Sequence, residues 1–205
     1  ASLWKRLRPE LIEATNALTM GDVRDLRNFM GAVIDDRAFA RHKAAIDRAH
    51  ATSSITVEAG GSYDDSVGYF VRPTILSSTD PTDEIFTTEY FGPILGVHVY
   101  PDRAFDRMLD QMESVAPYAL TGSIIAQDRA VIAKVAEKLR FAAGNFYIND
   151  KPTGAVVGQQ PFGGGRASGT NDKAGSAQNL LRWTSVRSIK ENFVPPKEHG
   201  YPHMA

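Results

Sequence analysis

The sequence predicts an α/β protein with a mostly parallel sheet and helices on both faces of that sheet. Two observations lead to this class. Between residues 94 and 148, short apolar runs typical of strands alternate with amphipathic segments typical of helices. The amphipathic segments are about a dozen residues long, which is the length that a crossover between parallel strands requires. A sheet connected in this way is covered on both faces, so its strands are expected to be buried.

The sequence pattern of the N-terminal part of the chain predicts two helices. Apolar residues recur at helical spacing between residues 3 and 18, where Pro9 is expected in a first turn or at a break. Asp35 or Asp36 can cap a second helix, whose apolar stripe ends near His50. We therefore expect the chain to form two helices before its first strand.

The first extended segments follow the second helix. A short strand is expected at residues 55–57, closed by a pair of glycines. Residues 69–71 and 74–76 are also strand-like, but they flank Pro73. Because proline cannot donate a hydrogen bond to a neighbouring strand, this extended segment is expected near the edge of a sheet.

The regular alternation begins after these segments. Strands are expected at residues 94–99, 120–126 and 144–148. Asp102 starts a helix after the first of these strands, and Asp128 caps a helix after the second. The order of strand, helix and strand predicts a parallel arrangement of the three strands.

The C-terminal part of the chain has a different pattern. Residues 171–178 are polar and small, residues 180–190 end in an alternation typical of an exposed strand, and the tail is irregular. An exposed edge strand is a template for pairing with another chain. We therefore expect one α/β domain over residues 1–179, followed by a C-terminal arm and tail over residues 180–205.

Composition argues against several classes of function. Lys and Arg (23) nearly balance Asp and Glu (24), so the net charge of -1 gives no reason to expect a nucleic acid or an anionic membrane as partner. No apolar run approaches the length of a membrane span. The sequence contains no cysteine, which removes disulfides, thiolate metal ligands and cysteine nucleophiles. A reducing cytoplasm is the compartment that fits this composition most easily.

Familiar catalytic and metal-binding motifs are missing from the sequence. The five histidines are scattered without metal-ligand spacing, so no metal site is expected. The sequence has no Gly-x-Ser-x-Gly nucleophile elbow, no Gly-x-Gly-x-x-Gly dinucleotide fingerprint and no Walker phosphate loop. We therefore assign no catalytic residue and no metal ligand in this chain.

Residues 84–93 contain the first candidate site. Glu89 and Phe91 are two positions apart, so they lie on the same side of an extended backbone, and Gly92-Pro93 then turns the chain away. A carboxylate can accept hydrogen bonds from both hydroxyls of a ribose, and an aromatic edge can pack on a nearby planar ring. The alternative is a solvated glutamate beside a core phenylalanine.

Residues 149–169 form the second candidate site. Five of the twelve residues between Gly158 and Gly169 are glycine, which allows close approaches that a Cβ forbids. Phe162 lies between a proline and three consecutive glycines, so the loop presents one ring and several bare backbone N–H groups to a small molecule. The alternative is an ordinary surface loop.

Taken in order, these segments resemble the C-terminal portion of an aldehyde dehydrogenase. The superfamily patterns E-x-F-G-P, G-x-x-x-x-N and P-F-G-G-x-x-x-S-G match residues 89–93, 144–149 and 161–169. Longer runs resemble the Δ1-pyrroline-5-carboxylate dehydrogenase branch of this superfamily: residues 144–151, 153–154, 157–164, 167–173 and 181–185. The resemblance extends from about Leu3 to about Val194, which is the whole chain but well under half of such an enzyme.

The resemblance implies a fold and an activity. The domain over residues 1–179 would be a partial aldehyde dehydrogenase catalytic domain. Residues 180–205 would be an oligomerisation strand and tail, in which the strand over residues 182–190 would pair with a neighbouring subunit of a homo-oligomer. The parent enzyme would use NAD to oxidise L-glutamate 5-semialdehyde to L-glutamate in proline catabolism. This chain alone is expected to bind NAD weakly or not at all.

The resemblance also implies roles for particular residues. Glu89 would hold the nicotinamide ribose of NAD, and Phe91 would pack near the nicotinamide. Backbone N–H groups of Gly154 and Ala155 would bind the α-carboxylate of the substrate, and Phe162 would pack on its aliphatic chain. In that family the catalytic cysteine, the general-base glutamate, the oxyanion asparagine and the adenosine-binding segment all precede the matched region. The chain alone is therefore expected to be inactive.

Two other hypotheses stay open. The chain could be a non-catalytic assembly protein that keeps the fold, or an independent carboxylate-binding or nucleotide-binding module. An assembly protein has no need to keep Glu89, Phe91 and the loop over residues 154–162 intact. All of them are intact, which favours an origin in a working enzyme.

Overall fold

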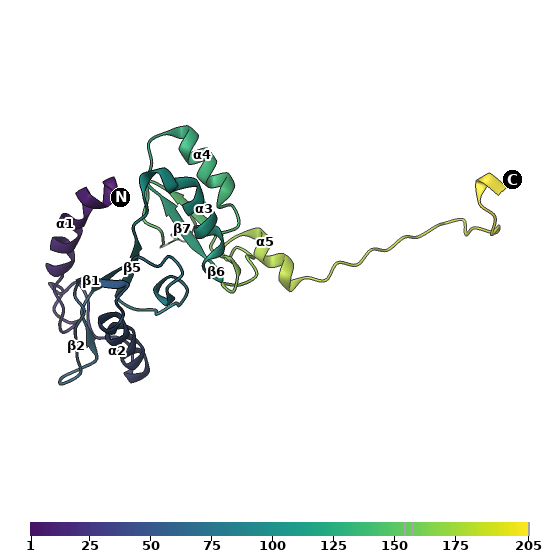
Figure 1. Cartoon of the computed structure of the whole chain (residues 1–205). Helices are drawn as coiled ribbons and strands as arrows, with labels where there is room; N and C mark the ends of the chain where they lie inside the picture. The colour runs from purple at the N-terminus through teal and green to yellow at the C-terminus, as the bar shows by residue number, and fades with distance from the viewer. Residues whose placement is uncertain (154, 157, 205) are drawn as a thin grey trace.

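The computed structural model describes residues 1–153, 155–156 and 158–204. Figure 1 shows an N-terminal part that contains α1, α2 and β1, a second part that contains α3, α4 and β7, and a C-terminal segment that extends away from both after α5. None of the helices in the described part of the chain is long and apolar enough to cross a membrane.

The first helix, α1 (Ser2–Asn16), continues through Pro9. This differs from the expectation that Pro9 occupies a first turn or a break. Proline inside a helix removes one backbone hydrogen bond, but an ion pair of 2.6 Å between Arg8 and the nearly buried carboxylate of Glu58 fastens the same turn to β1.

The second helix, α2 (Asp36–Ala51), confirms the predicted cap. The carboxylate of Asp35 accepts a hydrogen bond of 2.7 Å from the backbone N–H of Ala38. The helix buries one face against a three-stranded sheet of order β1-β4-β5. These strands are β1 (Ile55–Ala59), β4 (Thr74–Ser78) and β5 (Ile94–His98). Ala45 and Ala49 of the helix share a buried cluster with Ile55 and Leu76 of the sheet, which joins the two elements.

Short elements connect these strands. A hairpin links β1 to β4, and a 3₁₀ helix, η1, lies between β4 and β5. Their bounds are β2 (Tyr63–Asp64), β3 (Phe70–Val71) and η1 (Glu84–Phe86). Because the hairpin reverses the chain without a helical crossover, β1 pairs antiparallel to β4, whereas β5 pairs parallel to it.

The second part of the chain contains a parallel strand pair, β7 and β8, with two helices beside it. Its elements are η2 (Asp102–Ala104), α3 (Phe105–Ser114), β6 (Tyr118–Ala119), β7 (Thr121–Ile124), α4 (Arg129–Lys138), β8 (Asn145–Ile148) and β9 (Gly165–Arg166). Asp128 caps α4 as predicted. Leu109 of α3 packs with Val135 and Leu139 to form the core of this part.

The predicted mostly parallel sheet is not what the described residues form. Their strands form four small sheets, in which β4–β5 and β7–β8 are parallel and the other three pairs are antiparallel. The architecture is mixed α/β.

The predicted C-terminal oligomerisation strand is also not formed in the single chain. Its first residues belong to α5 (Ala177–Leu180) and η3 (Leu181–Trp183), and the backbone from Thr184 onward is extended without a neighbouring strand until η4 (Pro202–Met204). A strand is defined by pairing, and this segment has no pairing partner among the described residues.

Candidate functional site

The turn that contains Glu89 and Phe91 has an unusual backbone. Phe91 has φ 58°, and its side chain is 82% exposed. A bulky residue in the left-handed region is strained, and such strain concentrates at functional sites. An exposed aromatic ring on a strained backbone is therefore a feature that burial in the core does not explain.

Helix α2 holds this turn in place. Arg41 donates a hydrogen bond of 3.0 Å from Nε to the carbonyl oxygen of Tyr90. The imidazole of His42 is fully buried against Gly92, where an added Cβ would lie only 2.2 Å from two ring atoms. From the other side, the carbonyl oxygen of Pro93 accepts a hydrogen bond of 2.8 Å from Thr74 of β4. The turn is thus fastened to both a helix and a strand.

The residue between Glu89 and Phe91 anchors the turn to the core. Tyr90 is 8% exposed, and its hydroxyl donates a hydrogen bond of 2.8 Å to Glu84. Burial, together with the charge of Glu84, raises the pKa of Tyr90 to about 12. The carboxylate of Glu89 is exposed and makes no hydrogen bond or ion pair with other described residues. Its donors must therefore come from solvent or from a ligand.

Glu89 also lines a cavity of about 450 Å³ between η1 and the β7–β8 pair. The walls include Phe86 on one side, Phe146 of β8 on another, and Ser168 from the glycine-rich segment. Ser168 accepts a hydrogen bond of 3.1 Å at Oγ from the backbone N–H of Ala119. The cavity therefore lies between the E-x-F-G-P turn and the second part of the chain.

The loop that contains Phe162 is fixed by β8. Asn145 donates a hydrogen bond of 3.0 Å to the carbonyl oxygen of Pro161 and accepts one of 3.2 Å from the N–H of Gly163. Phe162 and Ala174 exchange two backbone hydrogen bonds of 2.9 and 2.8 Å. The conformation of this loop is thus determined by contacts distant in sequence.

The predicted site residues are only partly brought together. Phe162 and Ala155 are half-buried, and Gly154 lies outside the described residues. The cavity that contains Glu89 is lined by neither Phe91, Ala155 nor Phe162. A shared pocket that holds both the cofactor side and the substrate side stays a prediction.

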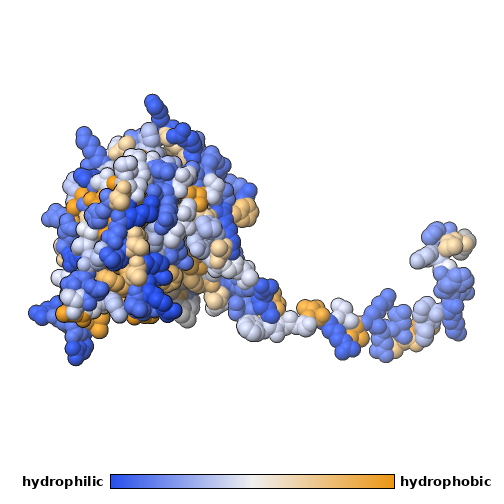
Figure 2. Space-filling view, turned by 60° about the horizontal axis from the view of Figure 1, so that its bottom comes forward, coloured by the Kyte–Doolittle hydropathy of each residue, from blue (hydrophilic) through white to orange (hydrophobic). Residues whose placement is uncertain are grey.

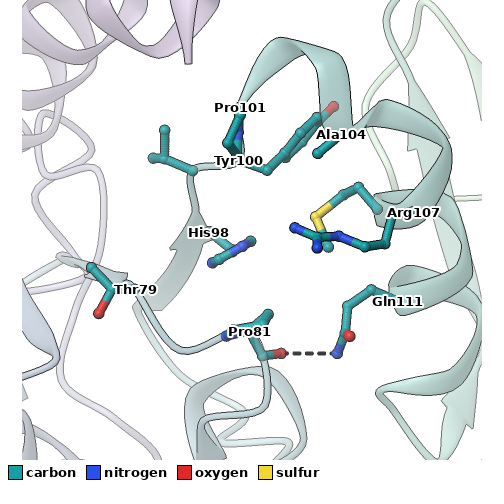
Figure 3. A pocket seen from close by; sticks show the side chains of 10 residues that line it. Thr79, Pro81, His98, Tyr100, Pro101, Ala104, Arg107 and Gln111 are labelled. Atoms are coloured by element: carbon teal, nitrogen blue, oxygen red, sulfur yellow. Dashed lines mark hydrogen bonds between the residues drawn. The ribbon is translucent and has the colours of Figure 1, made fainter.

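A second cavity, of about 480 Å³, lies between the end of β5 and α3 (Figure 3). His98 and Arg107 point into it from opposite walls, and Gln111 donates a hydrogen bond of 3.2 Å to the carbonyl oxygen of Pro81. Nδ1 of His98 donates to the carbonyl oxygen of Ser78 at 3.0 Å, which directs Nε2 toward the cavity. No group of three or more metal-ligating side chains occurs among the described residues.

Sequence reasoning missed the residues that support the two site segments. Arg41 and His42 contact a turn about fifty positions away, and no local motif marks such a contact. Lys173, which contacts the Phe162 loop, belongs to the run of residues 167–173, but no local pattern marks that contact. Gly92 of the E-x-F-G-P pattern is a local signal of the contact with His42, because a glycine can mark a place where another group approaches the backbone closely.

The buried imidazole of His42 predicts a pH dependence of stability. Burial and the positive charge of Arg41 lower the pKa of His42 in the folded chain. The unfolded chain then binds more protons below about pH 6.5, so stability is complete above that pH and falls as the pH drops through the folded pKa. We expect His42→Leu to reduce the loss of unfolding free energy between about pH 7 and pH 5 in urea titrations.

The matched control is His199→Gln, which changes an exposed histidine of the tail. It should leave the pH profile of the wild-type chain unchanged. Identical pH profiles for His42→Leu and the wild-type chain contradict this role of His42.

The sequence profile of the aldehyde dehydrogenase family matches residues 1–189. The chain therefore belongs to the aldehyde dehydrogenase family. Within this family it is similar to enzymes named Δ1-pyrroline-5-carboxylate dehydrogenase. It is 47% identical over 205 residues to the mitochondrial enzyme of Danio rerio, covering 100% of this chain and 37% of that enzyme. It is 48% identical to the human mitochondrial enzyme, covering 99% of this chain and 36% of that enzyme.

Solved structures show the same likeness. The Δ1-pyrroline-5-carboxylate dehydrogenase of Mycobacterium tuberculosis bound with NAD is 57% identical with a TM-score of 0.83, over 100% of this chain and 37% of that one. The corresponding Thermus enzyme with bound NAD is 29% identical with a TM-score of 0.73, over 87% of this chain and 33% of that one. The chain thus spans a little more than a third of the length of these relatives.

Proposed function

We propose that this chain is part of an NAD-dependent Δ1-pyrroline-5-carboxylate dehydrogenase, which oxidises L-glutamate 5-semialdehyde to L-glutamate in proline catabolism. The observation that carries the proposal is the identity of 57% to the M. tuberculosis enzyme over the whole chain. Its position in the C-terminal portion of such an enzyme, with the domain over residues 1–179, is part of the same proposal.

Glu89 and Phe91 supply the cofactor side of the site in this proposal. Glu89 presents an exposed carboxylate that can accept hydrogen bonds from the hydroxyls of the nicotinamide ribose. Phe91 presents an exposed ring, on a turn that α2 and β4 hold fixed, to the nicotinamide. A fixed turn lowers the entropic cost of ordering these groups when the cofactor binds.

Gly154, Ala155 and Phe162 supply the substrate side. Backbone N–H groups of the first two bind the α-carboxylate, and each charge-assisted hydrogen bond contributes about 1.5–3 kcal/mol. The ring of Phe162 packs on the aliphatic chain of the substrate. Anchoring the end of the substrate that does not react positions the aldehyde for chemistry.

An engineered chimera tests this function. We expect that the M. tuberculosis enzyme, with its matching segment replaced by this chain, oxidises L-glutamate 5-semialdehyde with NAD. The Glu89→Gln chimera should show a raised KM for NAD with little change in the KM for the semialdehyde, because only the ribose contact is weakened. NADH absorbance measures both constants.

The isolated chain is the negative control. It contains no cysteine, and loss of a catalytic nucleophile costs about 10⁶-fold in rate, so no turnover is expected from it. A folded chimera without activity, or turnover by the isolated chain, contradicts the proposal.

A second candidate function is assembly without catalysis. It is favoured by exposed apolar side chains that are interspersed with polar ones along the C-terminal segment (Figure 2). These residues are Leu181, Trp183, Val186, Ile189 and Phe193. In the proposed enzyme the same segment pairs with a neighbouring subunit to form a homo-oligomer. An inactive chimera that still oligomerises supports assembly instead.

The compartment belongs to the proposal as well. The absence of cysteine fits a reducing cytoplasm, whereas the relatives from Danio rerio and human are named mitochondrial. The cytoplasmic assignment is therefore not confirmed.

A further inference from the structure

Lys173 lies where three segments of the chain meet. It follows the glycine-rich loop and lies directly before Ala174, whose backbone pairs with Phe162. Its backbone has φ 55°, and that of Asn171 has φ 58°. Non-glycine residues in the left-handed region cost free energy and persist only where surrounding contacts enforce them. Two such residues within three positions indicate that this segment is held in a specific conformation.

The ammonium group of Lys173 supplies those contacts. Nζ donates hydrogen bonds to the carbonyl oxygen of Gly144, to that of Gly163 at 2.9 Å, and to Oδ1 of Asn145 at 3.3 Å. A lysine ammonium has three N–H donors, so all of them have an acceptor here. Two acceptors belong to the start of β8 and its preceding residue, and one belongs to the Phe162 loop.

The charge of Lys173 is not neutralised by a carboxylate. None of the ion pairs formed by the described residues includes this lysine, and burial lowers its pKa. Ordinary surface lysines keep the ammonium in water. A half-buried ammonium directed at three neutral oxygens is thus a structural tie between two segments rather than a solvated charge.

The chain approaches itself closely at this point. A Cβ on Gly144 would lie 2.1 Å from the carbonyl oxygen of Gly163. Asn145 adds hydrogen bonds to Pro161 and Gly163 on the same side. Three oxygen acceptors converge on the ammonium group. Oδ1 of Asn145 also accepts from the N–H of Gly163, so the carbonyl oxygens of Gly144 and Gly163 are the acceptors that lose this donor when the ammonium is removed. The ammonium therefore adds to the hydrogen bonds of Asn145 and Ala174 that hold the loop in this position.

We propose that Lys173 is a positioning residue, whose ammonium fixes the Pro161–Gly165 loop on β8 and thereby sets the position of Phe162. The consequence for substrate binding rests on the proposed function, which assigns Phe162 to the substrate. The structural tie itself does not depend on that function. Arginine cannot replace the lysine, because its planar fork does not match three convergent acceptors.

The absence of cysteine allows a test on the isolated chain. Lys173→Cys introduces a single thiol. Alkylation with 2-bromoethylamine restores an ammonium at nearly the length of lysine, whereas alkylation with iodoacetamide gives a neutral side chain. Amide hydrogen exchange at Phe162, Gly163 and Ala174 measures how often the loop opens, because the N–H groups of these residues are hydrogen-bonded in the closed loop. The neutral form should exchange about tenfold faster or more, and aminoethylation should restore most of the protection.

Equal protection in both alkylated forms overturns the proposal, because the ammonium then has no role. Loss of protection that aminoethylation does not restore overturns it as well. Lys138→Cys with the same two reagents is the matched control, since Lys138 is a surface lysine of α4 paired with Asp110. Its two alkylated forms should leave exchange at the Phe162 loop unchanged.

Kinetics of the chimera provide a second readout that remains usable if the cysteine variant does not fold. Lys173→Met should raise the KM for the semialdehyde about tenfold or more and leave the KM for NAD within about twofold. Equal changes in both constants, or a fall in kcat alone, contradict a positioning role. If the unsubstituted chimera is inactive, the proposed function fails, and amide exchange alone decides the role of Lys173.

Discussion

Gly144→Ala will destabilise the chain by at least about 3 kcal/mol, the upper end of the usual range for overpacking. The added Cβ would lie 2.1 Å from the carbonyl oxygen of Gly163 and 2.5 Å from the Cα of Gly164. Both neighbours are backbone atoms, so no side-chain rotation can relieve the clash. The loop must move away from β8, and its hydrogen bonds to Asn145 and Lys173 are then lost. Urea unfolding monitored by circular dichroism measures the change.

Gly165→Ala is the matched control for this prediction. An added Cβ at Gly165 meets nothing within 4 Å, although the residue lies in the same glycine run. We expect a change within about 0.5–1 kcal/mol, set by backbone entropy rather than by contacts. Equal destabilisation by the two substitutions means that the close approach of Gly144 to the loop is not what limits stability.

Gly92→Ala will reduce the unfolding free energy by about 2–3 kcal/mol. The new Cβ would lie 2.2 Å from ring atoms of His42, which is fully buried and has no room to turn away. Relief requires a shift of the turn that contains Glu89 and Phe91. In the chimera, the same substitution should therefore raise the KM for NAD.

A double-mutant cycle with His42→Ala separates the clash from other effects. Removal of the imidazole leaves space for the new methyl group. The cost of Gly92→Ala should then fall by at least about 1 kcal/mol in the His42→Ala background. Additive costs would mean that the contact between Gly92 and His42 is not responsible.

Local signals in the sequence located most elements. The expected strands at residues 94–99, 120–126 and 144–148 correspond to β5, β7 and β8. Asp35 and Asp128 cap their helices through hydrogen bonds to nearby N–H groups. Such features depend on neighbours within a few positions, and a sequence displays them directly.

The pairing between strands could not be predicted from such local signals. The antiparallel contact of β1 with β4 depends on the short hairpin between them. Ile55 lies opposite Ser78 in this pairing, and a contact between residues so far apart in sequence leaves no periodic pattern.

The residues of the candidate site also fall into those that local patterns identify and those that only the fold reveals. Short sequence patterns identify Glu89, Phe91 and Phe162, and the structure adds that Phe91 has an exposed ring on a strained backbone. The supports beneath these residues, His42 and Lys173, come from other parts of the chain. They become visible only when the chain is folded.

The most direct test of the account is a crystal structure of the chimera with NAD and L-glutamate bound. We expect the carboxylate of Glu89 to lie within about 2.6–3.2 Å of the nicotinamide ribose hydroxyls. We also expect backbone N–H groups of Gly154 and Ala155 to hold the glutamate α-carboxylate beside Phe162. A cofactor bound away from Glu89, or a glutamate that contacts neither Ala155 nor Phe162, would contradict it.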